Sequence, residues 1–282
     1  MEPMEQWRAG TGDWKYFNIP LEHVFEIAAG WKTILGDVEK PWLCWNVNPR
    51  WSILQQKLVL AVGWTPIVGF DPRVGAPPLV EGSILIDFNE KLQLPVLWPH
   101  FPLEFVFLFA DRLAFWHSDL LCRLSVMRRL AVQFASLQDG QMSAVFDRGG
   151  LRRRLKVKMH RFWELCGCTT KSASENQFYN GAGWWRHLEH HPKCALEEER
   201  TRRSSYDYDH GVGILYWKKK YNGHVIPIDI KLVKEGHCTE TRNKAYRILP
   251  NHFNPMRNLR SEIDINFSVD EITALLGIAH LL

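Results

Sequence analysis

The stretch Leu113-Ala-Phe-Trp-His-Ser-Asp119 decides how the chain is interpreted. Four apolar residues are followed at once by three polar ones, which is the pattern of a buried strand that ends abruptly. In open α/β sheets, ligands bind outside the carboxyl ends of the strands. We therefore expect His117, Ser118 and Asp119 to lie at a strand end and to be the first candidates for a functional site.

Apolar segments upstream of this stretch are also typical of buried strands. Residues 43–47 are predicted to form a strand, and Ser52 is predicted to cap the helix that follows it. Residues 64–70 and 83–88 are predicted to form two further strands, separated by a connection rich in Gly and Pro. Strands that alternate with helices predict an α/β fold with a Rossmann-like, mainly parallel sheet flanked by helices.

The downstream half continues this alternation. We predict helices over 120–137, 186–191 and 211–221, and strands over 141–146 and 225–230. The segment 268–282 is predicted to be an amphipathic helix, because Ser268 and Glu271 form a capping-box pattern before an apolar run. No internal repeat is present, so we expect one domain over residues 1–282, with an N-terminal extension (1–40) and a C-terminal helical segment (250–282).

Composition and charge exclude several classes of protein. Hydrophobic residues make up 46% of the chain and charged residues 23%, which excludes a disordered tail, a collagen and a coiled coil. The net charge of +4 is too small to predict a nucleic-acid partner. The uncharged stretch 58–70 is shorter than the roughly 18 apolar residues of a membrane span, so no transmembrane segment is expected.

The N-terminal residues and the cysteines bear on the compartment. Residues 1–16 lack the basic-then-apolar order of a secretory signal, so a cytoplasmic location is expected. Six cysteines are sparse for a chain of 282 residues, and reduced thiols are expected.

The polar end of the first strand has the chemistry of a cation site. Imidazole nitrogens of His117 and carboxylate oxygens of Asp119 can hold a divalent cation, and such a cation can neutralise a diphosphate leaving group. The alternative is that Asp119 only caps the next helix.

The order of the later segments resembles one family. The strand-end Asp119 is followed by an aromatic and glycine-rich segment (178–185), by Asp207-Tyr-Asp209-His210 before a helix, and by Gly236-His237 after a strand. This order, over residues 42–238, resembles GT-A glycosyltransferases, especially the retaining family that includes the blood-group transferases. The resemblance implies a GT-A-like fold, a nucleotide-sugar donor, a carbohydrate or other acceptor, and Mn²⁺ or Mg²⁺ as cofactor.

The same resemblance assigns roles to individual residues. Asp119 takes the place of the last aspartate of the family's D-x-D sequence and His117 that of the first, with Ser118 between them in the donor site. His237 resembles a late histidine that contacts the metal or the diphosphate. Asp209 matches the late acidic residue that faces the reacting sugar, and it is the catalytic candidate.

Aromatic and basic residues complete the expected site. Trp184 and Trp185 follow a Gly-x-Gly turn and, with Tyr179, are expected to line the acceptor side, because flat aromatic faces stack on sugars. Arg153 and Lys156 belong to a basic cluster that is expected to fold over the diphosphate. The alternative for that cluster is a solvated surface.

Two other functions stay open at this point. Because His117-Ser-Asp119 departs from D-x-D, the chain could be a non-catalytic carbohydrate- or protein-binding module on the same scaffold. A zinc-stabilised scaffold is the other alternative, since several potential zinc ligands lie close together in sequence. These are Cys166, Cys168, His187, His190, His191 and Cys194.

Overall fold

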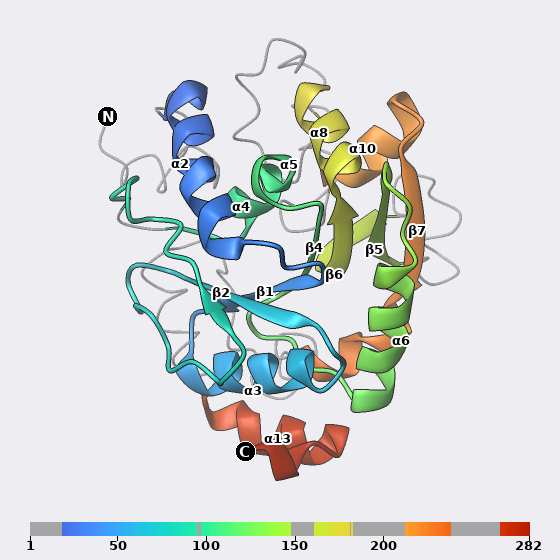
Figure 1. Cartoon of the computed structure of the whole chain (residues 1–282). Coiled ribbons are helices and arrows are strands. Elements are labelled where there is room, and N and C mark those ends of the chain that lie inside the picture. Colours follow the sequence, from blue (N-terminus) through green and yellow to red (C-terminus); the bar gives the residue numbers. More distant parts are fainter. Residues whose placement is uncertain (1–18, 95–96, 148–160, 181, 183–211, 238–265) are drawn as a thin grey trace, which may run out of the picture.

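A seven-stranded sheet runs through the centre of the protein (Figure 1). The computed structural model describes residues 19–94, 97–147, 161–180, 182, 212–237 and 266–282. Within these ranges the strands are β1 (Pro41–Asn46), β2 (Thr65–Phe70), β3 (Ile84–Leu85), β4 (Arg112–Trp116), β5 (Gln141–Asp147), β6 (Arg161–Thr170) and β7 (His224–Asp229). Their order across the sheet is β3-β2-β1-β4-β6-β5-β7.

The sheet is mixed but mostly parallel. β1 is parallel to β2 and β4, β2 is parallel to β3, and β5 is parallel to β7. β6 alone among these strands runs antiparallel to its neighbours β4 and β5. The carboxyl ends of β1, β4 and β7 therefore face the same edge of the sheet, and the α/β, mainly parallel architecture expected from the sequence is confirmed.

Helices cover both faces of the sheet (Figure 1). The described α-helices are α2 (Leu21–Leu35), α3 (Pro49–Leu60), α4 (His100–Glu104), α5 (Val106–Phe109), α6 (Leu124–Ala135), α8 (Lys171–Tyr179), α10 (Val212–Lys220) and α13 (Asn266–Leu276). Three short 3₁₀ helices are η4 (Ile230–Leu232), η5 (Lys234–Gly236) and η6 (Ala279–Leu281). None of the described helices is both long and apolar enough to cross a membrane.

The central strands are buried on both faces, as in parallel sheets covered by helices. All six residues of β1 are buried, and their side chains alternate between two hydrophobic clusters. Leu43 and Trp45 pack with residues of α2, α4, α5, α8 and α10, whereas Trp42 and Cys44 pack with residues of α3, α6 and α13. This alternation explains why the strand segment reads as a continuous apolar run in the sequence.

Several predicted elements agree with the structure and others need correction. The strands predicted at 43–47, 64–70, 113–119, 141–146 and 225–230 correspond to β1, β2, β4, β5 and β7, while that at 83–88 is reduced to β3. Ser52 does not cap α3. The N-cap is Asn48, whose side chain accepts hydrogen bonds from the Arg50 and Trp51 backbone N–H groups, with Pro49 as first helical residue.

The other corrections concern helix limits. The helix predicted over 120–137 spans only Leu124–Ala135, because residues 120–122 are buried in the segment that leaves β4. Ser268 lies inside α13, which begins at Asn266, so the capping-box prediction is wrong. The helix predicted over 186–191 lies outside the described residues.

The two ends of the chain hold well-packed helices. α2 falls within the predicted N-terminal extension, yet Val24, Ala28 and Trp31 are buried in the main hydrophobic cluster. α13 packs on α3 and η5, and Arg50 of α3 pairs with Asp270 at 2.7 Å. Both helices therefore belong to the same packed unit as the sheet.

The strand order reverses beside β1, because β2 and β3 lie on one side of it and β4 on the other. Such a reversal between neighbouring parallel strands opens a crevice outside their carboxyl ends, where open α/β sheets bind ligands. His117 follows β4 directly, so it lies at this point of the fold.

Candidate metal centre

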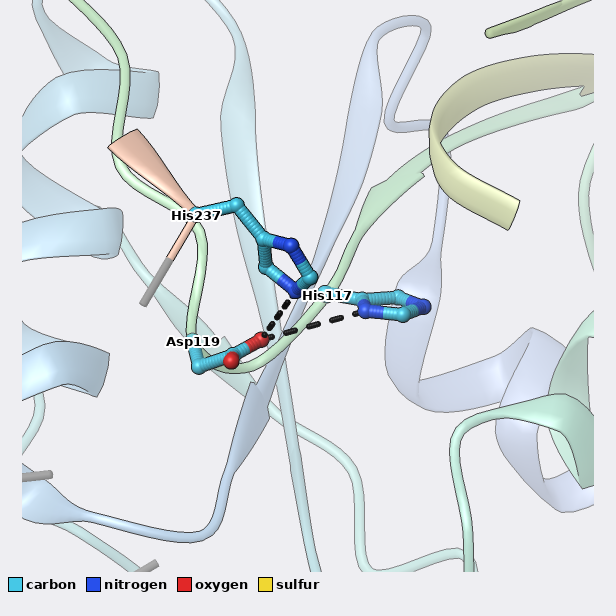
Figure 2. A group of neighbouring side chains, drawn as sticks. All are labelled: His117, Asp119 and His237. Carbon is cyan, nitrogen blue, oxygen red and sulfur yellow. Dashed lines mark ion pairs between the residues drawn. The ribbon is translucent and has the colours of Figure 1, made fainter. Parts of the chain in front are cut away.

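Two histidines and one aspartate converge at the carboxyl edge of the sheet. Asp119 Oδ1 lies 3.2 Å from His237 Nε2 and 3.8 Å from His117 Nδ1. The two imidazole rings have centroids 5.4 Å apart and are inclined by 65°. Figure 2 shows the three side chains pointing toward one another, His117 and Asp119 from the segment after β4 and His237 from the end of the η5 segment. The structure thus brings together all three predicted metal ligands.

The backbone around the cluster is fixed by buried polar groups. Gln55 of α3 donates hydrogen bonds from its side-chain amide to the carbonyls of His117 (2.8 Å) and Leu120 (2.9 Å). The backbone N–H of His117 donates to the Leu165 carbonyl of β6 at 3.0 Å. The segment after β4 is therefore held from the helix side and from the neighbouring strand.

A short antiparallel bridge brings His237 to this segment. Leu120 pairs with His237, and the Leu121 N–H donates to the Gly236 carbonyl at 3.1 Å. A Cβ atom on Gly236 would lie 1.7 Å from the Leu121 carbonyl oxygen. Only glycine permits this approach, so Gly236 is what lets the histidine come within reach of Asp119.

The cluster is buried, with one side nearer to solvent. The exposed fraction of the side chain is 6% for His237, 11% for Asp119 and 20% for His117. Neither ring nitrogen of His237 makes a hydrogen bond with the described residues. A buried polar group left without a hydrogen bond costs about 1 to 3 kcal/mol, so this imidazole is well suited to a ligand that uses its nitrogen.

The donor set fits a divalent transition metal. Each of the three side chains offers one ligand atom, and these atoms lie within 4.8 Å of one another. Imidazole nitrogens suit transition metals, whereas Mg²⁺ prefers carboxylate, carbonyl and water oxygens. Of the two cations expected from the sequence, Mn²⁺ is the transition metal. Three ligands from the described part of the chain also leave coordination positions for a substrate.

A second carboxylate lies behind the cluster. Glu164 of β6 is buried, with its side chain 3% exposed, and its Oε2 lies 2.9 Å from His100 Nε2 of α4. Its Oε1 lies 3.6 Å from His117 Nε2. Burial by itself raises the pKa of Glu164, but the charge and hydrogen bonding of His100, with smaller contributions from His117, outweigh it and lower this pKa to about 2.

Two of the remaining predicted site residues, Ser118 and Tyr179, lie within the described ranges. Ser118 lies between the two candidate ligands and is partly exposed. Tyr179 is the last residue of α8, and its ring packs against Phe107 and Phe178. The other predicted site residues lie outside the described ranges; they are Arg153, Lys156, Trp184, Trp185 and Asp209.

The cysteines predicted as zinc ligands have a different setting. Cys166 and Cys168 are both buried in β6, where burial is the main factor that raises the pKa of each thiol above its ordinary value. Zinc binds the thiolate form, so this setting disfavours a metal at these two sulfurs. The three histidines and Cys194 of that hypothesis lie outside the described residues.

Sequence reasoning missed the side chains that surround the cluster. Glu164 carries the clearest signal, because it is a single acidic residue within the apolar run 162–166. His100 and Gln55 carry no such signal, since each is one polar residue at the start or within a helix and finds its partners far along the chain.

Comparison with known proteins adds no relative to this description. No family model, no curated protein and no solved structure matches the chain.

Proposed function

We propose that the protein is a divalent-metal-assisted glycosyltransferase, which moves a sugar from a nucleotide donor to a carbohydrate or other acceptor. The observation that carries the proposal is the convergence of His117, Asp119 and His237 outside β4, where the strand order reverses. That is where an open α/β sheet binds its ligands. The GT-A resemblance of the sequence names the same three residues as contacts of the metal and the diphosphate.

The chemistry of the cluster supports this function. A cation at the site would neutralise the charge of a departing diphosphate. His117 and Asp119 lie in the segment directly after β4, with one residue between them, so the end of the strand positions both ligands. His117 is the most exposed of the three side chains, so the donor is expected to approach from its side.

Residues outside the described ranges complete the proposal. Asp209 is proposed to assist at the anomeric carbon, because carboxylates stabilise an oxocarbenium-like transition state. Arg153 and Lys156 are proposed to contact the diphosphate. Trp184 and Trp185 are proposed to line the acceptor side, together with Tyr179.

A purely structural metal site is a less suitable interpretation. Structural zinc sites almost always use four protein ligands and leave no open position. Within the described residues the group at His117, Asp119 and His237 supplies three, and it lies at the edge of the sheet rather than between its strands.

The test is metal-dependent binding of the donor. Thermal unfolding of the wild-type protein is measured with a panel of nucleoside diphosphate sugars, each with and without Mn²⁺. We expect one donor to raise the melting temperature only when Mn²⁺ is present, because a ligand that binds the folded state stabilises it by mass action. Slow hydrolysis of that donor, followed by release of free sugar, is the accompanying activity.

Two matched variants assign the effect to the site. Asp119→Asn is expected to abolish both the Mn²⁺-dependent shift and the hydrolysis. Asp270→Asn removes a carboxylate from the exposed ion pair with Arg50 and is expected to leave both intact. Binding and hydrolysis that survive in folded Asp119→Asn would overturn the proposal, and metal-dependent binding without any hydrolysis or transfer would favour the non-catalytic module.

A further inference from the structure

The antiparallel strand β6 brings a second carboxylate, that of Glu164, beside the metal cluster. Its pairing with β4 aligns Trp116 with Cys166, and the next backbone contact is the hydrogen bond from His117 N–H to the Leu165 carbonyl. Glu164 follows this contact in register, at the same edge of the sheet. Strand pairing therefore fixes its position relative to His117.

The two ring nitrogens of His117 face different carboxylates. Nδ1 lies 3.8 Å from Asp119 Oδ1, on the side where the cluster would hold a cation. Nε2 lies 3.6 Å from Glu164 Oε1, on the opposite side of the ring. The second contact is longer than a standard hydrogen bond, and it acts through electrostatic attraction.

A neutral imidazole carries its proton on one nitrogen and presents a lone pair on the other. A carboxylate beside Nε2 favours the proton there, because it attracts the N–H dipole. That tautomer leaves the lone pair on Nδ1, which is the nitrogen that faces Asp119. Asp119 lies at a similar distance from Nδ1 and attracts the proton there, but a cation bound to Asp119 removes that attraction. Glu164 is then the carboxylate beside the imidazole N–H, and it supports the tautomer that a metal ligand needs.

We propose that Glu164 is a positioning residue of the metal site, which holds His117 in the Nε2–H tautomer and orients Nδ1 toward the cation. This inference rests on the proposed function, since it assigns a role at the same metal site. Glu164 does not reach the cation or the donor itself; it acts through His117.

His100 fixes the carboxylate from the other side. Its Nε2 lies 2.9 Å from Glu164 Oε2, and both side chains are buried, with exposed fractions of 10% and 3%. The carboxylate is thus held between an imidazole of α4 and an imidazole of the metal cluster. Burial and the contact with His100 therefore hold the carboxylate beside His117.

The first experiment measures cation affinity. Titration calorimetry with Mn²⁺ alone compares the wild type with Glu164→Gln, which keeps the size of the side chain and removes its charge. We expect binding about 10- to 100-fold weaker, the usual loss when the carboxylate partner of a ligating histidine is removed. Thr169→Val is the matched control, because Thr169 is equally buried in β6 at the opposite end of the strand and is expected to leave the affinity unchanged.

The second experiment reads the tautomer directly and needs no folded Glu164 variant. The ¹⁵N shifts of His117 are measured in metal-free Asp119→Asn, where Glu164 is the remaining carboxylate beside the ring among the pairs described, and they are assigned by their loss in His117→Gln. They are expected to show a protonated Nε2 and an unprotonated Nδ1. A structural role of Glu164 in β6 alone predicts no such bias. The opposite tautomer overturns the inference.

The outcomes separate the two proposals. If the wild type binds Mn²⁺, His117→Gln loses it and Glu164→Gln binds within twofold of the wild type, the positioning role is wrong while the metal site stands. If the wild type binds no divalent cation, the proposed function fails and the inference fails with it.

Discussion

The polar side chains at the two ends of the paired strands β4 and β6 have different kinds of partner. At the end that begins β4, Arg112 donates hydrogen bonds to the carbonyls of Phe134 (2.9 Å) and Ala135 (3.0 Å), the last residues of α6. At the other end, His117 lies between the carboxylates of Asp119 and Glu164. At the first end a side chain caps the carboxyl end of α6, and at the second end side chains that can bind a ligand lie together.

The contrast extends to the residues next to each end. At the start of β4, the hydroxyl of Thr170 donates to the Gln141 carbonyl and accepts from the Gly140 N–H, so its bonding capacity is used within the backbone. At the far end, the buried ring nitrogens of His237 make no hydrogen bond with described residues. Hydrogen-bonded polar groups are compatible with a stable fold, whereas a buried imidazole whose nitrogens make no hydrogen bond costs free energy unless a ligand uses it.

The largest effect is expected from Gly236→Ala, at the cluster end. The added Cβ would lie 1.7 Å from the Leu121 carbonyl oxygen, so the bridge between Leu120 and His237 must open. We expect the free energy of unfolding to fall by about 1 to 3 kcal/mol, the usual cost of overpacking. Because His237 then moves away from Asp119, Mn²⁺ binding measured by calorimetry is expected to weaken by at least about tenfold.

Gly30→Ala is the control for this substitution. Gly30 is exposed in α2, and a Cβ there meets nothing within 4 Å. It is expected to stabilise the protein by about 0.5 to 1 kcal/mol, since alanine is the better helix former, and to leave Mn²⁺ affinity unchanged. A folded Gly236→Ala protein with wild-type affinity would contradict the role of the bridge.

An intermediate effect is expected from Arg112→Met, at the end of β4 where Arg112 caps α6. The variant removes the hydrogen bonds from the charged guanidinium to the last carbonyls of α6. Hydrogen bonds to charged groups contribute about 1.5 to 3 kcal/mol, and because this site is only partly buried we expect the free energy of unfolding to fall by about 1.5 kcal/mol. Chemical denaturation should show this loss while Mn²⁺ affinity stays unchanged. Arg129→Met, on the exposed face of α6, is the control and should change stability by less than about 0.5 kcal/mol. A loss of metal affinity in Arg112→Met would break the separation of the two ends.

The sequence was sufficient for the strands that are buried on both faces. β1, β2, β4 and β5 lie within apolar runs bounded by turn residues, and burial on both faces produces such runs. β6 was not predicted, because Gly167, Cys168 and the threonines that follow resemble a loop. In the structure Gly167 is required, since a Cβ there would lie 2.3 Å from the Ser143 carbonyl oxygen of β5. The antiparallel strand could not be recognised from local pattern alone.

The candidate site was predictable only in part for the same reason. His117 and Asp119 follow an apolar strand, which is a local signal. Glu164 and His100 depend on partners that strand pairing and helix packing bring from distant parts of the chain. His237 was named through the family resemblance, but its approach to Asp119 depends on the bridge at Leu120, which no local pattern indicates.

The smallest effect is expected from Asp139→Asn, and its effect on the free energy of unfolding depends on pH. Thr170, the N-cap of α8, makes no side-chain capping bond, and Asp139 replaces it by accepting hydrogen bonds from the Ser172 hydroxyl and from the Ser172 N–H at 3.0 Å. These bonds, the hydroxyl first, lower the pKa of Asp139 below its ordinary value. The stabilisation is therefore complete above the unfolded pKa of about 3.9 and is lost as pH falls through the lower folded value.

Because Asp139 is exposed, we expect Asp139→Asn to cost only about 0.5 to 1 kcal/mol at pH 7, with unchanged Mn²⁺ affinity. The difference between wild type and variant, measured by urea denaturation over pH 2 to 7, should shrink below pH 4. A difference that grows as pH falls would show that the charge of Asp139 does not stabilise α8.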